Sequence, residues 1–490
     1  MLFNSFEFLV FFPIVFAIYW LARKSNVLQN AVLVVASCLF YAWVDWRFLF
    51  LIGFTAVITY TTGVLMQRAE SKTKRKTFVA LNIIVNLTIL GFFKYYNFFA
   101  ESFSSVFHSV GIALDVPTLK LILPIGISFY TFKAISYTLD LYKGKIESTC
   151  IKATYGMGGG KNLLSVLCYL LFFPQLLAGP IEKARDLFPQ FDKARTFSYQ
   201  QAINGSKLII WGLFKKIVIA DTACNIVNSI YSDFTTYNAS ALLICAVLYS
   251  FQIYGDFSGY SDMAIGIGKL LGIESKKNFN LPYLSRDIAE FWKRWHISLN
   301  TWFVEYVYIP LGGSRVSKYV TIRNTFIIFL LSGLWHGANW TFICWGAYHA
   351  LLFVPLLLLG KTKRFGKYEQ SKGITRKEWG HIILTFVFVT LGWIIFRSPD
   401  IDTACSYIVK LFNVTDYGMP NINPKRLFAI LECIVAIAFV AYMEIRHKAD
   451  NVVLTFGSKY ASVNFFGYLL VTAWAVLFYA VGQTFIYFQF

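Results

Sequence analysis

The chain has 490 residues, of which 57 % are apolar and only 14 % are charged, and its mean hydropathy is +0.55. These values exclude an ordinary soluble protein, in which the charged fraction is much larger. They predict an all-α polytopic membrane protein. The aromatic fraction of 19 % is larger than two interfacial belts need. Many aromatic rings must therefore pack inside the protein.

Apolar stretches of roughly 17 to 25 residues mark membrane-spanning helices. In chain order, the candidate spans are residues 6–22, 30–43, 48–65, 78–93, 119–139, 163–177, 209–219, 241–254, 326–335, 341–359, 381–396, 427–443 and 465–481. Several are short or interrupted, and such segments survive at membrane depth only where protein shields them from lipid. We expect about 11 to 13 transmembrane or re-entrant helices in a single membrane-embedded domain over residues 1–490.

Basic residues predict the orientation of the chain. No Lys or Arg precedes the first span, whereas Arg23 and Lys24 follow it, so the positive-inside rule places the N-terminus outside the cytoplasm. The same rule assigns two basic stretches, residues 67–77 and 361–378, to cytoplasmic loops. Most of the net charge of +19 is better explained by cytoplasmic loops than by a nucleic-acid partner.

Cysteines and histidines give no metal-binding pattern. No two of the eight cysteines are spaced as CxxC, and the six histidines include no HExxH motif. We therefore expect no disulfide framework and no bound metal. Most of the cysteines read as small buried hydrophobic residues.

Two carboxylates lie in an apolar and glycine-rich stretch, YGDFSGYSDMAIGIGKLLG, at Asp256 and Asp262. A carboxylate inside the membrane is costly and is a functional candidate by default. The alternative is structural: each aspartate hydrogen-bonds a helix end or pairs with a nearby Arg or Lys. The glycines predict close helix packing.

Residues 285–303, SRDIAEFWKRWHISLNTWF, are both charged and aromatic. On a helix, Trp292, His296 and Asn300 share one face. The segment is too polar to span the membrane, so it predicts an interfacial or re-entrant helix that brings cations and a histidine to the edge of a cavity. The alternative is an amphipathic anchor in which His296 is a hydrogen-bonded interfacial residue.

Residues 324–360 contain no Asp, Glu, Lys or Arg, yet they include the stretch LLSGLWHGANW with His336. A neutral imidazole can act as a general base, because its ordinary pKa of about 6.5 is close to working pH and burial keeps it neutral. Gly333 and Gly337 are expected to leave room for a substrate chain. The alternative is a packed, hydrogen-bonded histidine without a catalytic role.

Five motifs in this order carry a family resemblance: LPIGISFYTFKAISYTLDLYKGKI, FFPQLLAGPI, DFSGYSDMAIGIGKLLG, EFWKRWHISLNTWFVEYVYIPLGGSR and GLWHGANWTFICWGAYH. Over nearly its whole length the chain resembles the membrane-bound O-acyltransferase family. It is most similar to the bacterial branch that acylates alginate and other polysaccharides, peptidoglycan or teichoic acid. The YIPLGGSR sequence and the chain length are more like those of the polysaccharide O-acetylases.

The resemblance implies a fold, a reaction and partners. The family fold is a set of helices around a central tunnel across the membrane. His336 matches the family histidine, and His296 matches the second histidine of this branch. The implied donor is a cytoplasmic thioester such as acetyl-CoA, with no bound cofactor, and the implied acceptor is an extracytoplasmic glycan. A secreted or lipid-anchored esterase-like partner of the SGNH type and a location in the bacterial cytoplasmic membrane are also implied.

Acyl transfer to an alcohol needs a base, stabilisation of an oxyanion and exclusion of water. His336, walled by Trp335, is the predicted base. His296, Asn300 or a backbone N–H near Gly337 is expected to stabilise the oxyanion.

Other charged residues have supporting roles in this hypothesis. Asp256 is a further supporting candidate. Lys293, Arg294 and Arg315 are expected to attract the anionic phosphates of the donor, since Coulomb steering favours this encounter.

Three alternatives stay open. Among enzymes, D-alanyl transfer to teichoic acid is the close rival. In another class, a proton-coupled transporter would use Asp256, Asp262 and His336 as an ion path, although the duplicated motifs expected of inverted repeats are missing from the sequence. A catalytically inactive scaffold is the third, and the two histidines disfavour it.

Overall fold

The computed structural model describes the whole chain except residues 115, 147–158, 363–373, 448–460 and 480–490. In the described ranges every regular element is a helix, so the predicted all-α architecture is confirmed. The chain divides into two compact units, and the single domain expected from the sequence stays a prediction. The first comprises Met1–Gly205 with Ile267–Lys276, and the second comprises Ser206–Gly266 with Lys277–Phe490.

Six helices of the described chain are long and apolar enough to cross a membrane: Phe48–Arg68, Lys72–Ser109, Ala239–Leu270, Trp340–Leu358, Arg376–Arg397 and Pro424–Arg446. Shorter apolar helices cover Phe6–Leu21, Asn26–Ala42 and Ser462–Leu477. The protein is therefore a multi-pass membrane protein. The larger number of spans expected from the sequence stays a prediction.

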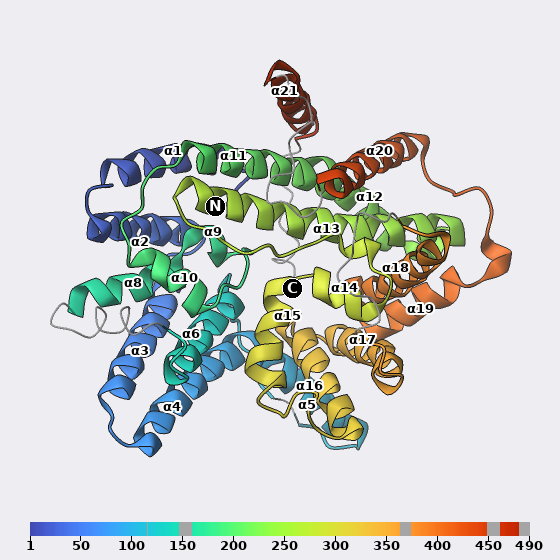
Figure 1. Ribbon diagram of the computed structural model, residues 1–490. Coiled ribbons are helices and arrows are strands. Elements are labelled where there is room, and N and C mark those ends of the chain that lie inside the picture. The colour runs from blue at the N-terminus through green and yellow to red at the C-terminus, as the bar shows by residue number, and fades with distance from the viewer. Residues whose placement is uncertain (115, 147–158, 363–373, 448–460, 480–490) are drawn as a thin grey trace. The chain divides into compact units, whose positions relative to one another are not determined.

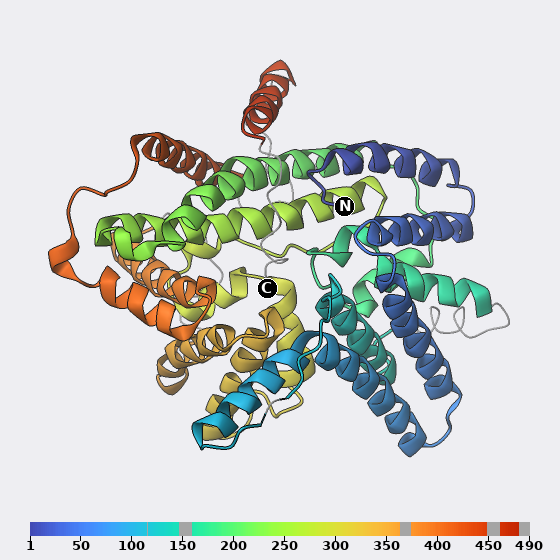
Figure 2. The ribbon, with the colours of Figure 1, turned by 180° about the vertical axis from the view of Figure 1, so that it is seen from behind.

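The first unit begins with the helices α1 (Phe6–Leu21), α2 (Asn26–Ala42), α3 (Phe48–Arg68), α4 (Lys72–Leu90), the π-helix η1 (Gly91–Tyr95) and α5 (Tyr96–Ser109). It continues with α6 (Ile127–Tyr142), α8 (Gly159–Leu171), α9 (Phe173–Leu176) and α10 (Ala184–Phe191). Helices α3 and α4 lie side by side, in blue, and α6 packs against both (Figure 1, Figure 2).

Two boundaries in this unit differ from the sequence prediction. The basic stretch 67–77 is not a loop throughout, because α3 ends at Arg68 and α4 already begins at Lys72. The span predicted over 119–139 starts late, because Gly126 adopts a left-handed φ of 78° and α6 begins after it. The second basic stretch, 361–378, lies partly outside the described residues, and its last three residues open α18 (Arg376–Arg397).

Helix α11 (Tyr199–Phe214) leads from the first unit into the second. The second unit then contains η2 (Lys215–Asp221), α12 (Thr222–Tyr231), η3 (Phe234–Thr236), α13 (Ala239–Leu270), η4 (Pro282–Leu284), α14 (Ile288–Arg294), α15 (Ile297–Phe303) and η5 (Val304–Tyr308). Its last helices are α16 (Lys318–His336), α17 (Trp340–Leu358), α18, α19 (Ile401–Leu411), η7 (Val414–Asp416), α20 (Pro424–His447) and α21 (Ala461–Leu477).

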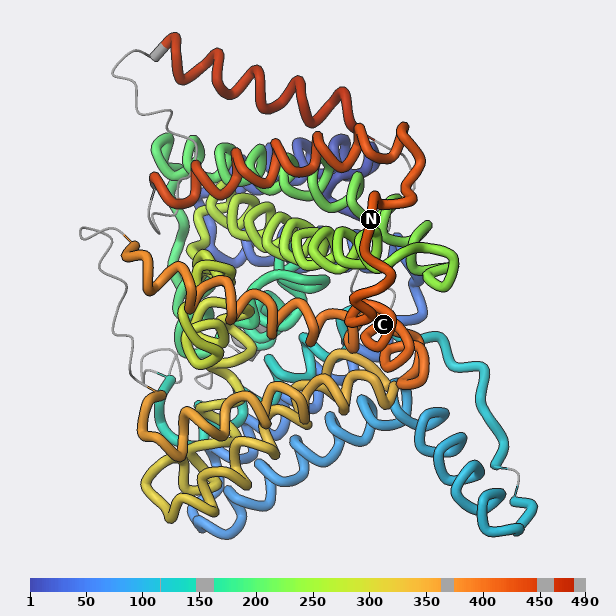
Figure 3. The backbone as a smooth tube through the Cα atoms, turned by 90° about the vertical axis from the view of Figure 1, so that its right-hand side faces the viewer, coloured from blue at the N-terminus to red at the C-terminus, as the bar shows by residue number. Residues whose placement is uncertain are grey.

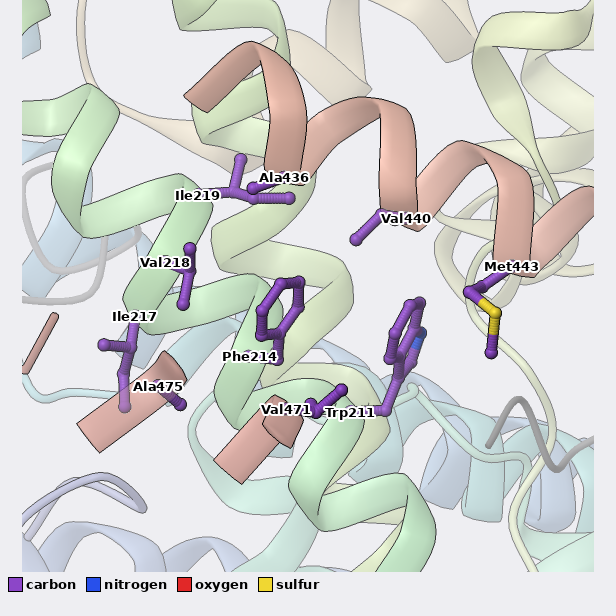
Figure 4. Packing of buried hydrophobic residues seen from close by; sticks show 10 residues of the cluster. All are labelled: Trp211, Phe214, Ile217, Val218, Ile219, Ala436, Val440, Met443, Val471 and Ala475. Carbon is purple, nitrogen blue, oxygen red and sulfur yellow. The ribbon is translucent and has the colours of Figure 1, made fainter. Parts of the chain in front are cut away.

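A buried apolar cluster joins α11, η2, α20 and α21 within the second unit (Figure 4). The rings of Trp211 and Phe214 stack with their centroids 5.9 Å apart. Nearby, α11 and α13 pack backbone against backbone, since a Cβ on Gly259 would lie 2.7 Å from the carbonyl oxygen of Gly212. The close packing predicted from the glycines of α13 is therefore confirmed at Gly259.

Candidate active site

A cavity of 410 Å³ lies within the second unit, and both His296 and His336 line it. This volume falls in the ordinary range for small-molecule sites. The cavity is formed by α14, α15, η5, α16 and α17, and most of its lining is aromatic or aliphatic. The polar lining residues are Lys293, His296, Asn300, Tyr308, Ser314, Thr325, Ser332, His336 and Thr362.

His336 is the last residue of α16, and the packing of α16 on α17 sets its position (Figure 1, Figure 3). The two helices touch through glycines. A Cβ on Gly333 would lie 2.2 Å from the carbonyl oxygen of Phe342, and one on Gly346 would lie 2.3 Å from that of Phe329. The expectation that Gly333 leaves room for a substrate chain is therefore wrong, because α17 fills that space.

Aromatic rings surround the His336 imidazole, which is 5 % exposed. The rings of Trp345 and Phe396 each lie 5.3 Å from it, measured between centroids. The ring of Trp335 lies 5.0 Å from His336 and 5.6 Å from His296, so it contacts both imidazoles. The histidine pair therefore sits in an environment of low polarity.

The helical conformation is interrupted at His296. The sequence predicted one helix over residues 285–303, and this is wrong, because α14 ends at Arg294 and α15 begins at Ile297. His296 between them has φ 43° and ψ 54°, a left-handed conformation that side chains other than glycine rarely adopt. Strain of this kind clusters at functional sites. The cavity nevertheless gathers Trp292, His296 and Asn300, the three residues predicted to share one face.

His296 is 1 % exposed and lies outside the six candidate spans. Its ring meets that of Phe257 edge-on at 4.6 Å, and its Nδ1 lies 3.1 Å from Oδ1 of Asn278. Burial lowers the pKa of His296 to about 3, because an apolar environment disfavours the charged imidazolium. The side chain is therefore neutral at physiological pH. One turn later, the amide of Asn300 donates to the carbonyl oxygen of Trp292 at 2.6 Å.

The structure brings only one of the three predicted donor-binding cations to the cavity. Lys293 lines it, and its Nζ donates to the carbonyl oxygen of Thr362 at 3.0 Å. Arg294 is buried and pairs with Glu290 at 2.6 Å. Arg315 is exposed in the segment between η5 and α16. Lys293 is thus the cation placed to meet an anionic substrate.

Both intramembrane aspartates form ion pairs with lysines of η2. Lys216 lies 2.8 Å from Asp256 and 2.8 Å from Asp221, and Lys215 lies 2.6 Å from Asp262. Neither Asp256 nor Asp262 lines the cavity of the two histidines. Of the two readings of these aspartates, the ion pairs favour the structural one.

A third histidine, His349, lies behind the cavity. Its ring is 5.0 Å from those of Trp292 and Trp345, and its side chain is fully buried. It does not line the cavity. Among the described residues, no three His, Cys, Asp or Glu side chains are grouped so that they would hold a metal ion.

Asn278 is a site residue that the sequence did not reveal. It precedes the charged and aromatic segment by several residues, in the short sequence NFN, and has neither charge nor a periodic pattern to mark it. Only the folded chain brings its amide to His296 and to Ser298.

A buried histidine pair in an aromatic cavity of a multi-pass helical protein defines a membrane enzyme whose chemistry is shielded from water. Residues 109–396 match the sequence profile of the membrane-bound O-acyltransferase family. The chain belongs to this family and is an O-acyltransferase.

Several named proteins are similar in sequence to this chain over more than half of its length. The probable alginate O-acetylase of Azotobacter vinelandii is 38 % identical, over 90 % of this chain and 84 % of the relative. The peptidoglycan O-acetyltransferase of Helicobacter pylori is 34 % identical, over 87 % and 82 %. The teichoic acid D-alanyltransferase of Bacillus subtilis is 30 % identical, over 58 % of this chain and 70 % of that protein.

Proposed function

We propose that the protein transfers an acetyl group from a cytoplasmic thioester, acetyl-CoA, to hydroxyl groups of an extracytoplasmic polysaccharide. The observation that carries this proposal is that two histidines far apart in the sequence line one aromatic cavity. The names of the relatives that match most of the chain support acetyl as the group and a glycan as the acceptor.

His336 acts as the general base in this reaction. The hydroxyl oxygen attacks the thioester carbonyl carbon while its proton passes to the imidazole. As the tetrahedral intermediate collapses, the C–S bond breaks and the thiolate takes up the proton. The rings of Trp345 and Phe396 beside His336 exclude water, which would otherwise hydrolyse the thioester. Lys293, which lines the cavity, attracts the donor phosphates.

A partner works with the enzyme on the far side of the membrane. It is a secreted or lipid-anchored esterase-like protein of the SGNH type, as the family resemblance implies. The enzyme itself resides in the bacterial cytoplasmic membrane, with its N-terminus outside. This arrangement puts the thioester in the compartment where it is made and the glycan in the other.

D-alanyl transfer would use the same base and the same cavity, but the teichoic acid D-alanyltransferase of Bacillus subtilis matches only 58 % of this chain. Proton-coupled transport is disfavoured for a different reason. Its candidate carriers, Asp256 and Asp262, are held in ion pairs with Lys216 and Lys215.

Inverted membrane vesicles that receive labelled acetyl-CoA, the partner and the polysaccharide test the proposal. We expect label in the glycan, and a loss of about 10²- to 10⁴-fold for His336→Ala, the usual contribution of a general base. His108→Ala is the matched control, because this exposed histidine of α5 does not line the cavity. Unlabelled glycan with wild-type protein, or full activity of His336→Ala, overturns the proposal. Transfer from a D-alanyl carrier protein alone supports the rival.

A further inference from the structure

The side chain of Asn278 is buried, at 1 % exposure, and its orientation is determined by its neighbours. Its Oδ1 lies 3.2 Å from the backbone nitrogen of Ser298 and 2.8 Å from the hydroxyl of the same residue. A backbone N–H can only donate, so the atom that it reaches must be the amide oxygen. The amide nitrogen then donates to Ser261 at 3.2 Å.

The same oxygen lies 3.1 Å from Nδ1 of His296. An acceptor at this place requires a proton on Nδ1. Because a neutral imidazole has one N–H and one acceptor nitrogen, Nε2 carries the lone pair. Nε2 is buried without a hydrogen-bond partner in the described chain, and His296 lines the cavity.

The backbone around Asn278 also holds the unusual conformation of His296. The carbonyl oxygen of Asn278 accepts from the N–H of Ile297 at 2.9 Å, and the N–H of Asn280 donates to the carbonyl oxygen of Arg294 at 3.0 Å. These bonds fasten the chain just before and just after His296. One short segment therefore supports both the left-handed φ and the orientation of the ring.

We infer that Asn278 is a positioning residue that holds His296 as the Nδ1–H tautomer, so that Nε2 is the proton acceptor of this cavity-lining ring. The catalytic meaning of this inference rests on the proposed acyl transfer. His296 then accepts the hydrogen bond of a hydroxyl on the incoming glycan. It does not donate to the oxyanion, which was the role expected from the sequence.

The tautomer is measurable without any activity. Protein with ¹⁵N-labelled histidine in liposomes, with His296→Ala to assign the signal, is expected to show His296 protonated on Nδ1 alone. Asn278→Leu, of similar size but without an acceptor, is expected to lose this fixed tautomer. A wild-type signal from protonated Nε2 overturns the inference. Because the spectrum does not depend on transfer, failure here is distinct from failure of the proposed function.

Kinetics separate positioning from a merely structural role. Asn278→Asp keeps an acceptor but places a carboxylate beside Nδ1, which raises the pKa of His296 from about 3. Lys293, Tyr308 and His336 are the other ionisable side chains that line this cavity. Since the acceptor must be neutral, the acid limb of kcat/KM is expected to move to higher pH in Asn278→Asp.

Ser298→Ala is the matched control, because it removes the 2.8 Å bond to the same oxygen and leaves His296 untouched. We expect its pH profile to match the wild type. A purely structural role of Asn278 predicts lower melting temperatures for Asn278→Leu and Asn278→Asp with an unshifted profile, and that result would overturn the inference.

Discussion

Two lysines of the π-helix η2 form ion pairs with aspartates of the second unit. Lys216 lies between Asp221 and Asp256, 2.8 Å from each, and all three side chains are nearly inaccessible. Charges taken out of water are tolerated only when they are paired. The arrangement therefore explains why α13 carries Asp256 in an apolar stretch without assigning it to the reaction.

Replacing Lys216 with methionine leaves two carboxylates together without their cation. We expect Lys216→Met to lower the free energy of unfolding by about 3–5 kcal/mol, measured by denaturant unfolding of the purified protein in detergent. The triple variant that also carries Asp221→Asn and Asp256→Asn is expected to recover most of this loss. Lys76→Met, at an exposed position, is the control. Loss of transfer with unchanged stability would contradict a structural role.

Among single residues, the sequence indicated those whose polarity differs from that of the neighbouring residues. His336 and the two aspartates are polar groups in apolar stretches, so they were visible without the fold. Lys215 and Lys216 were not, because their pairing with different carboxylates depends on contacts across the fold. Asn278 has no such contrast, and its role depends wholly on contacts across the fold.

Among the helices, α16 and α17 matter most for the site. Helix α16 ends at His336, and residues of both helices line the cavity. The backbones meet at Gly346, where a Cβ would lie 2.3 Å from the carbonyl oxygen of Phe329. Small residues let membrane helices approach in this way. The position of the imidazole therefore depends on a residue ten positions further along the chain.

Gly346→Ala forces α16 and α17 apart. We expect a loss of about 1–3 kcal/mol in the free energy of unfolding, as for other overpacked sites, together with reduced acetyl transfer because His336 shifts. Thermal unfolding and the vesicle assay measure the two effects. Gly380→Ala is the control, because a Cβ there meets open space on α18. Equal melting temperatures for the two variants would contradict this account of the packing.

Long apolar stretches predicted the helices well, as for α3, α17 and α18. The break at His296 was not predictable, because RWHIS contains neither glycine nor proline to mark it. The tertiary hydrogen bonds from Asn278 and Asn280 support that break. The local sequence therefore predicted several of the residues that line the cavity, but it did not predict the backbone conformation that brings them together.

For the whole molecule, the distribution of basic residues predicts which loops face the cytoplasm. Arg23 and Lys24 follow the first apolar helix, and the basic stretch from Arg68 follows the third. The positive-inside rule puts both on the cytoplasmic side. We therefore expect the turn between α2 and α3, which includes Trp46, to lie outside.

Single cysteines at Ser25, Trp46 and Ser71 test this orientation, since all three positions are exposed. They are introduced into a variant whose eight native cysteines are alanine. A membrane-impermeant maleimide is expected to label Trp46→Cys in right-side-out vesicles, and Ser25→Cys and Ser71→Cys only after permeabilisation. The reverse pattern would invert the topology and put the thioester on the wrong side. Labelling of Ser25→Cys and Ser71→Cys from opposite sides would mean that α2 and α3 do not both cross the membrane.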